Sequence, residues 1–338
     1  MTSPEPLLEV TGLTKRFTDR SWATSRLRGR APASLVALDD VSFSVGRGET
    51  LGVVGESGSG KSTLARCLIR LHKAEAGAVT FDGVDVMAAQ GPALRDLRRS
   101  MQMVYQDPYS SLNPRMRVGD AVSEAALVHG LVERGDEGRY TAELLERVGI
   151  RKESARRYPH EFSGGQRQRI AIARALAVKP RLLIADEAVS ALDVSIQAQL
   201  LALFEEVRED LGLTIIFISH QLSVISRLAD RVAIMYLGRI VETGAVAKVF
   251  AEPAHPYTRA LFEAHPRVGA GRVRTPPAVR TEVPSAYDIP AGCRFHTRCP
   301  DAQGVCSESE PLLEPIGVGQ LAACHFPIRG TAERADSA

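Results

Sequence analysis

The stretch Gly55-Glu56-Ser57-Gly58-Ser59-Gly60-Lys61-Ser62 lies between an apolar segment and a segment with helical spacing. Residues 50–54, which precede it, are mostly apolar and partly β-branched, as is typical of a buried parallel strand. Residues 62–71, which follow it, place apolar side chains at a spacing of about 3.6 residues. Glycines allow consecutive N–H groups to turn toward an anion at the positive end of a helix. The stretch therefore predicts a phosphate-binding loop between a strand and a helix.

The fixed positions of this loop assign roles to individual side chains, because they fit the pattern G-x-x-x-x-G-K-[ST]. Lys61 is expected to reach the β- and γ-phosphates of a nucleotide, and the Ser62 hydroxyl is expected to ligate Mg²⁺. Thr63 extends the same segment. A plain Gly/Ser turn is the alternative, but the fixed positions and both flanking segments match the motif. We therefore predict that the chain binds a nucleoside triphosphate.

The composition describes an ordinary globular protein with more than one domain. Its 338 residues, 44% hydrophobic and 24% charged, are enough for a large core. The net charge of +2 gives no general argument for nucleic acid, and we expect no such partner. No apolar run approaches the roughly 20 residues of a membrane span, and the first residues lack a signal-peptide core. We therefore expect a cytoplasmic location, which still allows a membrane partner.

The region before the loop predicts an N-terminal sheet. Residues 7–17 and 35–54 alternate apolar and polar side chains, which favours strands. Phe17 follows the first of them and can either stack on a purine ring or complete the sheet's core. Its spacing alone favours the core. Residues 19–34 are rich in Arg, Ser, Gly and Ala, which predicts a solvated loop rather than a contact with lipid or a partner.

The region after the loop alternates strands with helical segments, as in an α/β core. A strand that begins at Met101 is expected to run out at Gln106 into a loop that reaches Pro114. Residues 118–158 are charged and helical in pattern, which predicts a helical subdomain inserted into the core. Residues 232–241 predict a final hairpin with its turn at Leu237-Gly238-Arg239.

A second anion-binding helix end is predicted at Ser163-Gly164-Gly165-Gln166. Ser163 is a good N-cap residue, and the two glycines leave backbone N–H groups open at the helix start. This helix end is separate from the first phosphate-binding loop, so the sequence predicts two anion sites.

Polar residues end the next two predicted strands. Asp186 suits Mg²⁺ coordination, and the adjacent Glu187 suits a general base that polarises water, although an acidic pair can also simply begin a loop. Asp193 precedes a helix predicted over 194–211. His220 can cap the next helix or bond a phosphate oxygen in the crevice at the carboxyl ends of the strands.

In this order, the motifs resemble the nucleotide-binding subunits of ABC transporters. The matching positions are the Walker A stretch 55–62, the Gln106 loop, the Ser163 signature, the Asp186-Glu187 Walker B pair, the Asp193 D-loop and the His220 switch. The resemblance covers about residues 7–250, and the signature is its specific part. It implies an α/β P-loop NTPase with a RecA-like core, an N-terminal antiparallel β subdomain and a helical subdomain at about 107–165.

In that family, two subunits sandwich two ATP molecules. The resemblance implies that Ser163 and the glycines after it close on the γ-phosphate held by Lys61 of the other subunit. It moves Phe17 toward an adenine-stacking role. It also implies that Gln106 contacts Mg²⁺ and couples to a membrane domain, while Glu187 and the switch histidine carry hydrolysis.

The finer resemblance is to the oligopeptide and dipeptide importer ATPases. It rests on residues 106–114, 190–197 and 255–258 and on the cysteine-containing tail. It implies a peripheral subunit on the cytoplasmic side of the cell membrane, with two integral membrane permeases, a second and paralogous ATPase, and an extracytoplasmic solute-binding protein. Ala188 and Gln221 depart from the family's usual proline and aspartate, but neither change removes a group needed for hydrolysis.

After the nucleotide-binding region, we expect a linker-containing segment at 251–284 and a small domain at 285–330. The small domain contains the four cysteines Cys293, Cys299, Cys306 and Cys324. Four thiols in so short a segment of a cytosolic protein favour a metal over disulfides. Coordination chemistry alone does not separate Zn²⁺ from an iron–sulfur cluster. The resemblance favours a structural [4Fe–4S] cluster, with Zn²⁺ and no metal as alternatives.

Together these observations predict an ATPase that powers the import of oligopeptides or dipeptides. The same role for nickel, other peptides or sugars stays open, because the ATPase does not contact the solute. A soluble ABC protein acting on DNA or the ribosome would be expected to carry a long coiled coil or two cassettes, and this sequence predicts neither. A small-molecule kinase would have no use for the signature at Ser163.

Overall fold

A computed structural model describes residues 5–18, 34–107, 111–190, 192–264 and 283–328. The segment 19–33 of the predicted loop insertion and residues 265–282 of the predicted linker-containing segment lie outside these ranges. None of the described helices is long and apolar enough to cross a bilayer.

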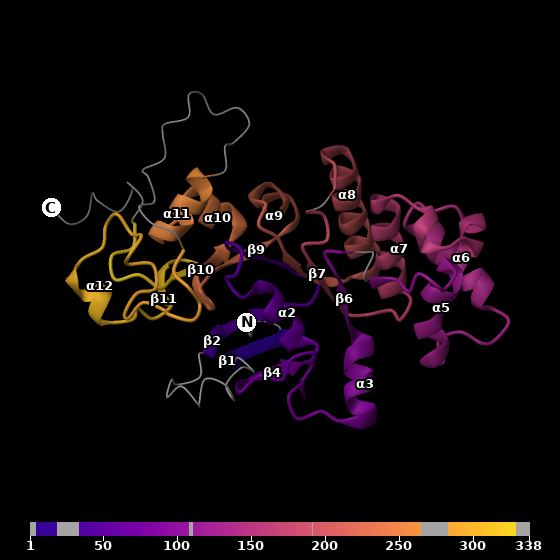
Figure 1. Ribbon diagram of the computed structural model, residues 1–338, viewed down its shortest axis with the longest axis horizontal. Helices are drawn as coiled ribbons and strands as arrows, with labels where there is room; N and C mark the ends of the chain where they lie inside the picture. Colours follow the sequence, from indigo (N-terminus) through magenta and orange to yellow (C-terminus); the bar gives the residue numbers. More distant parts are fainter. Residues whose placement is uncertain (1–4, 19–33, 108–110, 191, 265–282, 329–338) are drawn as a thin grey trace, which may run out of the picture.

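The main sheet is an α/β sheet that holds the phosphate-binding loop at its centre (Figure 1). In the described part of the chain its order is β11-β12-β10-β9-β3-β8-β7-β6. Its parallel strands are β6 (Met101–Val104), β7 (Leu182–Asp186), β8 (Thr214–Ile218), β3 (Thr50–Val54) and β9 (Arg231–Tyr236). Its antiparallel strands are β10 (Arg239–Ala245), β12 (Gln320–Ala322) and β11 (Glu314–Gly317).

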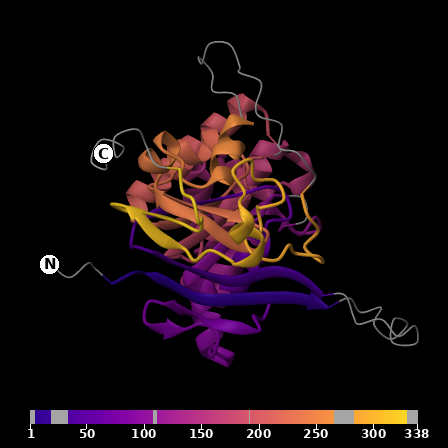
Figure 2. The same cartoon turned by 90° about the vertical axis from the view of Figure 1, so that its left-hand side faces the viewer.

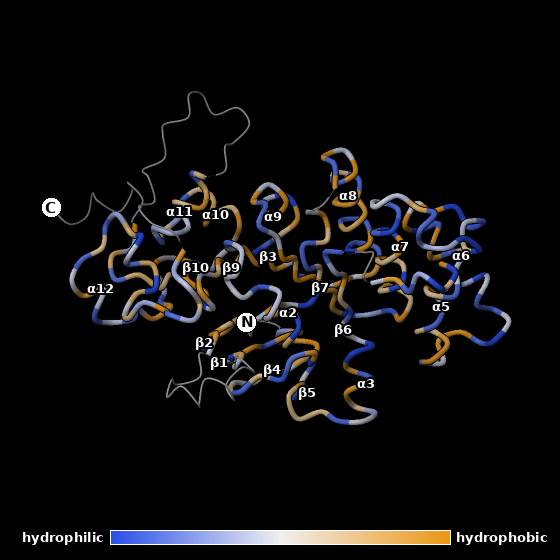
Figure 3. The backbone as a smooth tube through the Cα atoms, viewed as in Figure 1, coloured by the Kyte–Doolittle hydropathy of each residue, from blue (hydrophilic) through white to orange (hydrophobic). Residues whose placement is uncertain are grey.

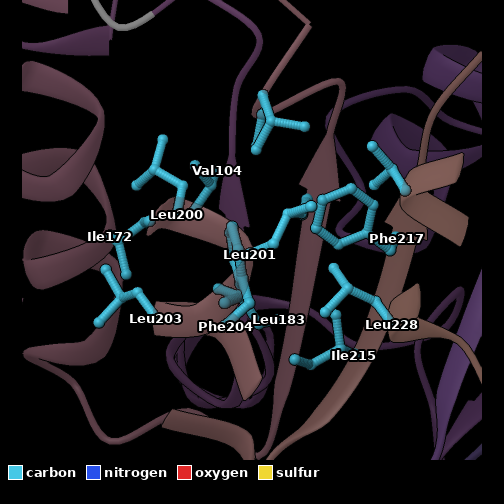
Figure 4. Packing of buried hydrophobic residues seen from close by; sticks show 14 of the residues in the cluster. Val104, Ile172, Leu183, Leu200, Leu201, Leu203, Phe204, Ile215, Phe217 and Leu228 are labelled. Carbon is cyan, nitrogen blue, oxygen red and sulfur yellow. The ribbon is translucent and has the colours of Figure 1, made fainter. Parts of the chain in front are cut away.

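The two faces of this sheet carry two separate hydrophobic clusters. Successive residues of β7 alternate between them, since Leu183 belongs to one cluster and Leu182 to the other. Helix α8 (Val194–Leu211) covers the first face, where Phe204 packs edge-on against Phe217 with ring centroids 5.2 Å apart (Figure 4). Strands covered on both faces are expected to be apolar throughout, and Figure 3 shows the contrast between β7 and the hydrophilic helix α3 (Gly91–Ser100).

The remaining core helices surround the sheet. They are α2 (Lys61–Leu68), α7 (Gly164–Leu176), α9 (Leu222–Leu228), α10 (Val246–Ala251) and α11 (Pro256–Glu263). Helix α2 ends at Leu68 instead of Leu71, because Arg70 takes a left-handed conformation with φ 55°. The predicted hairpin is present, and its turn residues Leu237 and Gly238 both have positive φ.

A second, antiparallel sheet forms the N-terminal layer, which Figure 2 shows below the main sheet. Its order is β2-β1-β4-β5, with strands β1 (Leu8–Thr18), β2 (Ser34–Val45), β4 (Ala76–Phe81) and β5 (Val84–Asp85). The expectation that all of residues 35–54 belong to this sheet is wrong for its last part. Strand β2 ends at Val45, and β3 pairs with β8 and β9 instead. The segment 46–49 turns the chain from one layer to the other.

The helical insertion extends to the right of the core in Figure 1. It contains α5 (Val118–Val128), α6 (Glu137–Arg147) and the short 3₁₀ helices η1 (Lys152–Arg156) and η2 (Pro159–Glu161). Val118, Val122 and Leu145 are fully buried in the same cluster as Ile170 of α7, so the insertion is packed onto the core. The strand predicted before it ends at Val104, and Gln106 lies in the following loop.

The cysteine-containing segment extends the main sheet. After helix α12 (Gly304–Glu308), strands β11 and β12 form a hairpin that pairs antiparallel with β10, with Ala322 opposite Glu242. Phe295 is buried in the larger hydrophobic cluster of the core. A segment with so few apolar residues of its own is therefore stabilised by packing on the nucleotide-binding core.

Candidate nucleotide-binding site

The phosphate-binding loop connects β3 to α2, and two of its glycines are required by close backbone contacts. Gly60 has φ 105°, and a Cβ there would lie 2.3 Å from the carbonyl oxygen of Ala37. A Cβ on Gly55 would lie 2.2 Å from the carbonyl oxygen of Met235. Since Cβ atoms essentially never come this close to backbone, neither position accepts a larger residue without movement of the loop.

Lys61 is buried inside this loop. Its Nζ donates to the carbonyl oxygens of Gly55 and Glu56, each at 2.8 Å, and lies 3.4 Å from Ser59 Oγ. Burial lowers the pKa of Lys61, while the carboxylates of Glu187 and Asp186 oppose that effect. The Lys61 ammonium has three rotatable N–H donors, so it can exchange these hydrogen bonds for hydrogen bonds to phosphate oxygens.

Two oxygen ligands for a divalent cation meet beside the loop. Ser62 Oγ, at the start of α2, donates to Asp186 Oδ1 at the end of β7 over 2.9 Å. Burial raises the pKa of Asp186, and the hydrogen bond from Ser62 opposes it. A hydroxyl and a carboxylate are hard oxygen donors of the kind that Mg²⁺ prefers, so the residues present fit this ion.

Two residues predicted from separate motifs, Gln106 and His220, converge on the carboxylate of Glu187. Gln106 Nε2 donates to Glu187 Oε2 at 3.0 Å, and His220 Nδ1 lies 3.4 Å from the same oxygen. Glu187 has φ 50°, a conformation uncommon for a residue other than glycine, and its N–H donates to Ile218 O at 3.0 Å. The Glu187 side chain is 18% exposed and therefore still reachable by water. Ser190, whose Oγ donates to Glu187 O at 3.0 Å, is a neighbour that we did not predict as a site residue.

The signature stretch caps helix α7 as predicted. Gln166 N donates to Ser163 Oγ at 3.3 Å, and Ser163 N donates to Gln166 Oε1 at 3.0 Å. This reciprocal pair is a capping box. A Cβ on Gly165 would lie 2.5 Å from Ile196 Cγ2, whereas Gly164 has only ordinary contacts. Within the described ranges, no hydrogen bond or ion pair joins Ser163 or Gln166 to the phosphate-binding loop.

Two other predicted site residues lie away from the carboxylates. Asp193 is the N-cap residue of α8, and its side chain makes no capping hydrogen bond there. Phe17, near the end of β1, is only partly buried and belongs to neither hydrophobic cluster, so the interpretation as a core residue is wrong. Its ring packs edge-on against His72 with centroids 5.3 Å apart, and Lys15 Nζ lies 5.0 Å from its centroid.

Two family descriptions match the chain. Residues 38–190 match "ABC transporter", and residues 241–306 match "Oligopeptide/dipeptide transporter, C-terminal region". A probable peptide ABC transporter ATP-binding protein of Sinorhizobium fredii is 48% identical over 95% of this chain and 90% of its own length. The chain belongs to the ABC transporter family. The oligopeptide transport ATP-binding protein AppF of Bacillus subtilis is 45% identical over 95% of this ABC ATPase and 98% of its own length.

Solved structures agree with this assignment. CbiO1 of Clostridium perfringens, part of an ABC transporter complex, matches with a TM-score of 0.62 and 29% identity over 73% of this ATPase and 92% of its own chain. A dimeric ATP-binding cassette bound to ADP and Pi matches with a TM-score of 0.62 and 25% identity over 71% and 98%. The P-loop NTPase fold and the ATPase class predicted from the motifs are thus confirmed. As an ABC ATPase, the chain belongs to a family whose members use ATP and Mg²⁺, dimerise and associate with membrane permeases.

The two departures from the family pattern leave the carboxylates of this ABC ATPase intact. Ala188 is buried directly after Glu187. Gln221 N donates to Ser219 Oγ at 2.9 Å, and the Gln221 side chain accepts a hydrogen bond from Gln197. Gln221 is thus used to fix the start of α9 against α8.

The C-terminal segment of the ABC ATPase contacts the phosphate-binding loop directly, which we did not predict. Glu56 N donates to Tyr257 Oη at 2.9 Å, and Arg298 donates two hydrogen bonds to the Glu56 carboxylate. Tyr257 stands in the 255–258 stretch, where the sequence indicates only a family resemblance. Arg298 stands between two cysteines, and its pairing with a residue 242 positions away has no sequence signal.

The four cysteines of the tail line one small cavity of about 10 Å³, together with residues that include His296 and His325. All four are free thiols, and burial raises the pKa of Cys299 and Cys324 to about 11. Within the described ranges, no three or more His, Cys, Asp or Glu side chains are already arranged to hold a single metal ion. The cavity thus gathers the donors of a four-thiolate centre, a set that suits either Zn²⁺ or an iron–sulfur cluster.

Proposed function

We propose that this ABC ATPase is the ATP-hydrolysing subunit of an importer of oligopeptides or dipeptides, bound at the cytoplasmic side of the cell membrane. The observation that carries the hydrolytic part is the convergence of Gln106 and His220 on Glu187, beside the Ser62–Asp186 pair. The match of residues 241–306 to a C-terminal region of peptide transporters, and the names of the relatives, support the solute class.

The phosphates of ATP bind to free N–H groups within residues 55–63 and to the Lys61 ammonium. Support comes from the depth of Lys61 in the loop and from its donors, which bond only neutral oxygens there. Ser62, Gln106 and Asp186 hold Mg²⁺, which neutralises charge on the phosphate oxygens when bound. The Ser62–Asp186 hydrogen bond supports this set, because it already brings two of the three ligands together.

Hydrolysis uses Glu187 as the base for the attacking water. The hydrogen bond from Gln106 fixes the direction of the carboxylate, and the partial exposure of Glu187 leaves water access. His220, whose Nδ1 lies 3.4 Å from the same oxygen, holds the γ-phosphate. Phe17 stacks on the adenine ring, a role supported by its half-buried position outside both hydrophobic clusters.

The signature residues complete the ATP site of a second subunit. Ser163, Gly164, Gly165 and Gln166 present the N-terminus of α7, and Asp193 is the N-cap residue of α8, whose Ile196 lies beside Gly165. Among the described residues, the capping box of Ser163 and Gln166 joins this helix end only to itself and not to the loop of the same chain, which supports an intermolecular site. We infer that the second subunit is a paralogous ATPase, and that two permeases and an extracytoplasmic solute-binding protein belong to the same system.

The four cysteines hold a [4Fe–4S] cluster with a structural role. Support is the convergence of four free thiols on one cavity, together with the match of residues 241–306 to the C-terminal region of peptide transporters. Bound iron would supply the positive charge that allows these buried thiols to ionise. Zn²⁺ is the alternative metal.

A transport assay with the reconstituted transporter tests the solute class. The ATPase would be assembled with its permeases in proteoliposomes, and ATP hydrolysis measured with the binding protein loaded with oligopeptides, dipeptides, nickel or a sugar. We expect peptides alone to stimulate both hydrolysis and uptake. If nickel or a sugar stimulated hydrolysis and peptides did not, the assigned solute class would be wrong, and the assignment as an ABC ATPase would be unaffected.

A further inference from the structure

We propose that Arg298 of the C-terminal segment is a positioning residue for ATP binding, because it neutralises and orients Glu56 within the phosphate-binding loop. The inference rests on the proposed phosphate-binding role of residues 55–63. It deepens that role by assigning part of the ATP affinity to a residue outside the ATP-binding motifs.

The pair between Arg298 and Glu56 has the geometry of a strong ion pair. Arg298 Nη1 donates to Glu56 Oε2 at 2.8 Å, and Nη2 donates to Oε1 at 3.0 Å. The Arg298 side chain is only 8% exposed, whereas the Glu56 side chain is 30% exposed, so water reaches the pair from the carboxylate side only. Two parallel charge-assisted hydrogen bonds fix both the position and the rotation of the carboxylate.

The guanidinium is held in place by aromatic residues of the core. Its central carbon lies 5.7 Å from the ring centroids of both Tyr236 and Phe295, and Nη1 also donates to Tyr236 Oη at 3.3 Å. Both rings are fully buried, and they pack edge-on with centroids 5.5 Å apart. Arg298 therefore reaches the loop from a rigid base.

Glu56 transmits this constraint to the lysine that binds phosphate. Its carbonyl oxygen accepts from Lys61 Nζ at 2.8 Å, and its N–H donates to Tyr257 Oη at 2.9 Å. The side chain, the N–H and the carbonyl of one loop residue are thus all bonded. Because Arg298 of the C-terminal segment holds Glu56 in place, it also holds in place the Glu56 carbonyl oxygen that accepts from Lys61.

The charge of Glu56 makes the pairing necessary. A carboxylate within the loop repels a triphosphate, and the repulsion grows where water is partly excluded. Arg298 neutralises the Glu56 carboxylate, so the positive charge of Lys61 is the loop charge that acts on the nucleotide. Without Arg298, ATP binding must overcome an unpaired carboxylate.

Equilibrium binding of a fluorescent ATP analogue to the full-length protein tests the proposal. We expect Arg298→Gln to raise the Kd for ATP about tenfold, which corresponds to about 1.4 kcal/mol. The KM for ATP rises in parallel while kcat at saturating ATP stays within about twofold, as for an effect on binding alone. Arg298→Lys keeps the charge but not the bidentate geometry, and regains part of the affinity. Wild-type affinity in both variants would overturn the proposal.

A second substitution separates charge from mere structural support. Adding Glu56→Gln to Arg298→Gln removes the unpaired carboxylate, so we expect the Kd to return to within about threefold of the wild type. A double variant as weak as Arg298→Gln alone would overturn the electrostatic role. Arg227 of α9 forms a bidentate pair with Glu205 of α8 instead of with the loop, at distances of 2.9 and 2.7 Å, and Arg227→Gln is the control with unchanged Kd. A wild type that failed to bind ATP would overturn the proposed function and this inference with it, whereas unchanged affinity in the variants of an ATP-binding wild type would overturn this inference alone.

Discussion

Gln106 Nε2 donates a hydrogen bond to Glu187 Oε2 over 3.0 Å, although the two residues are 81 positions apart in the chain. Gln106 follows β6 and Glu187 follows β7, and these strands are parallel neighbours. Because parallel neighbours present their carboxyl ends at the same edge of the sheet, residues that follow the two strands meet there. The residue that we associate with the membrane partner thus directly contacts the candidate base.

Replacement of this base is expected to separate ATP binding from hydrolysis. Glu187→Gln keeps the shape and the contact with Gln106 but loses the proton acceptor, so hydrolysis should fall at least about 100-fold with ATP affinity retained. Phosphate release and gel filtration with ATP measure the two properties, and we expect a trapped dimer. Exposed Glu206 on α8 provides the control Glu206→Gln, with normal hydrolysis. Normal hydrolysis by the Glu187 variant would mean that another group is the base.

The glycine at position 60 is expected to be essential for the shape of the loop. Gly60→Ala combines a left-handed φ with a Cβ placed 2.3 Å from Ala37 O, so ATP affinity should fall at least about tenfold. Gly48 also has a positive φ, at 70°, but a Cβ added there would meet no atom of the described residues within 4 Å. Gly48→Ala should therefore lower the free energy of unfolding by about 1 kcal/mol without changing ATP affinity. Nucleotide titration and denaturant unfolding distinguish the two effects, and equal affinities would contradict the steric argument.

Phe17 is expected to act on the nucleotide and not on stability. Phe17→Ala should raise the Kd for ATP about fivefold to tenfold, since stacking on a base contributes about 1–3 kcal/mol. The free energy of unfolding should change by less than about 0.5 kcal/mol, because Phe17 is outside both hydrophobic clusters. Phe81 is buried in the same N-terminal sheet, and Phe81→Leu should show the opposite pattern. If Phe17→Ala lost stability without a change in ATP affinity, Phe17 would have a packing role and not an adenine-stacking role.

The cysteine segment is expected to colour the purified protein. After anaerobic purification, a [4Fe–4S] cluster gives a brown protein with visible sulfur-to-iron absorbance, which Cys299→Ser should lose. Cys67 is buried in α2, so Cys67→Ala should keep the colour. A colourless protein with one bound zinc would assign the site to zinc. A colourless protein free of metal would contradict both assignments.

Much of the site could be predicted because its residues lie in local patterns. The loop at 55–62 is recognisable from glycine spacing between a strand and a helix, and Ser163 from its N-cap position before two glycines. Residues such as Asp186 and His220 stand at or just after the carboxyl ends of apolar, strand-like runs. Those runs form the parallel neighbours β7 and β8, so their carboxyl ends lie at the same edge of the sheet. For these residues, side-chain periodicity and turn chemistry carry the information directly.

The sequence by itself determined the α/β core, the order of the motifs and the two separate anion-binding helix ends. Only the tertiary structure decided that the N-terminal layer ends at Val45, that Phe17 is outside the core, and that Arg298 pairs with Glu56. The physical reason is the separation along the sequence of the residues that interact. A glycine turn or an amphipathic helix is encoded within a few residues, whereas an ion pair 242 positions apart depends on how β12 and Phe295 pack against the core.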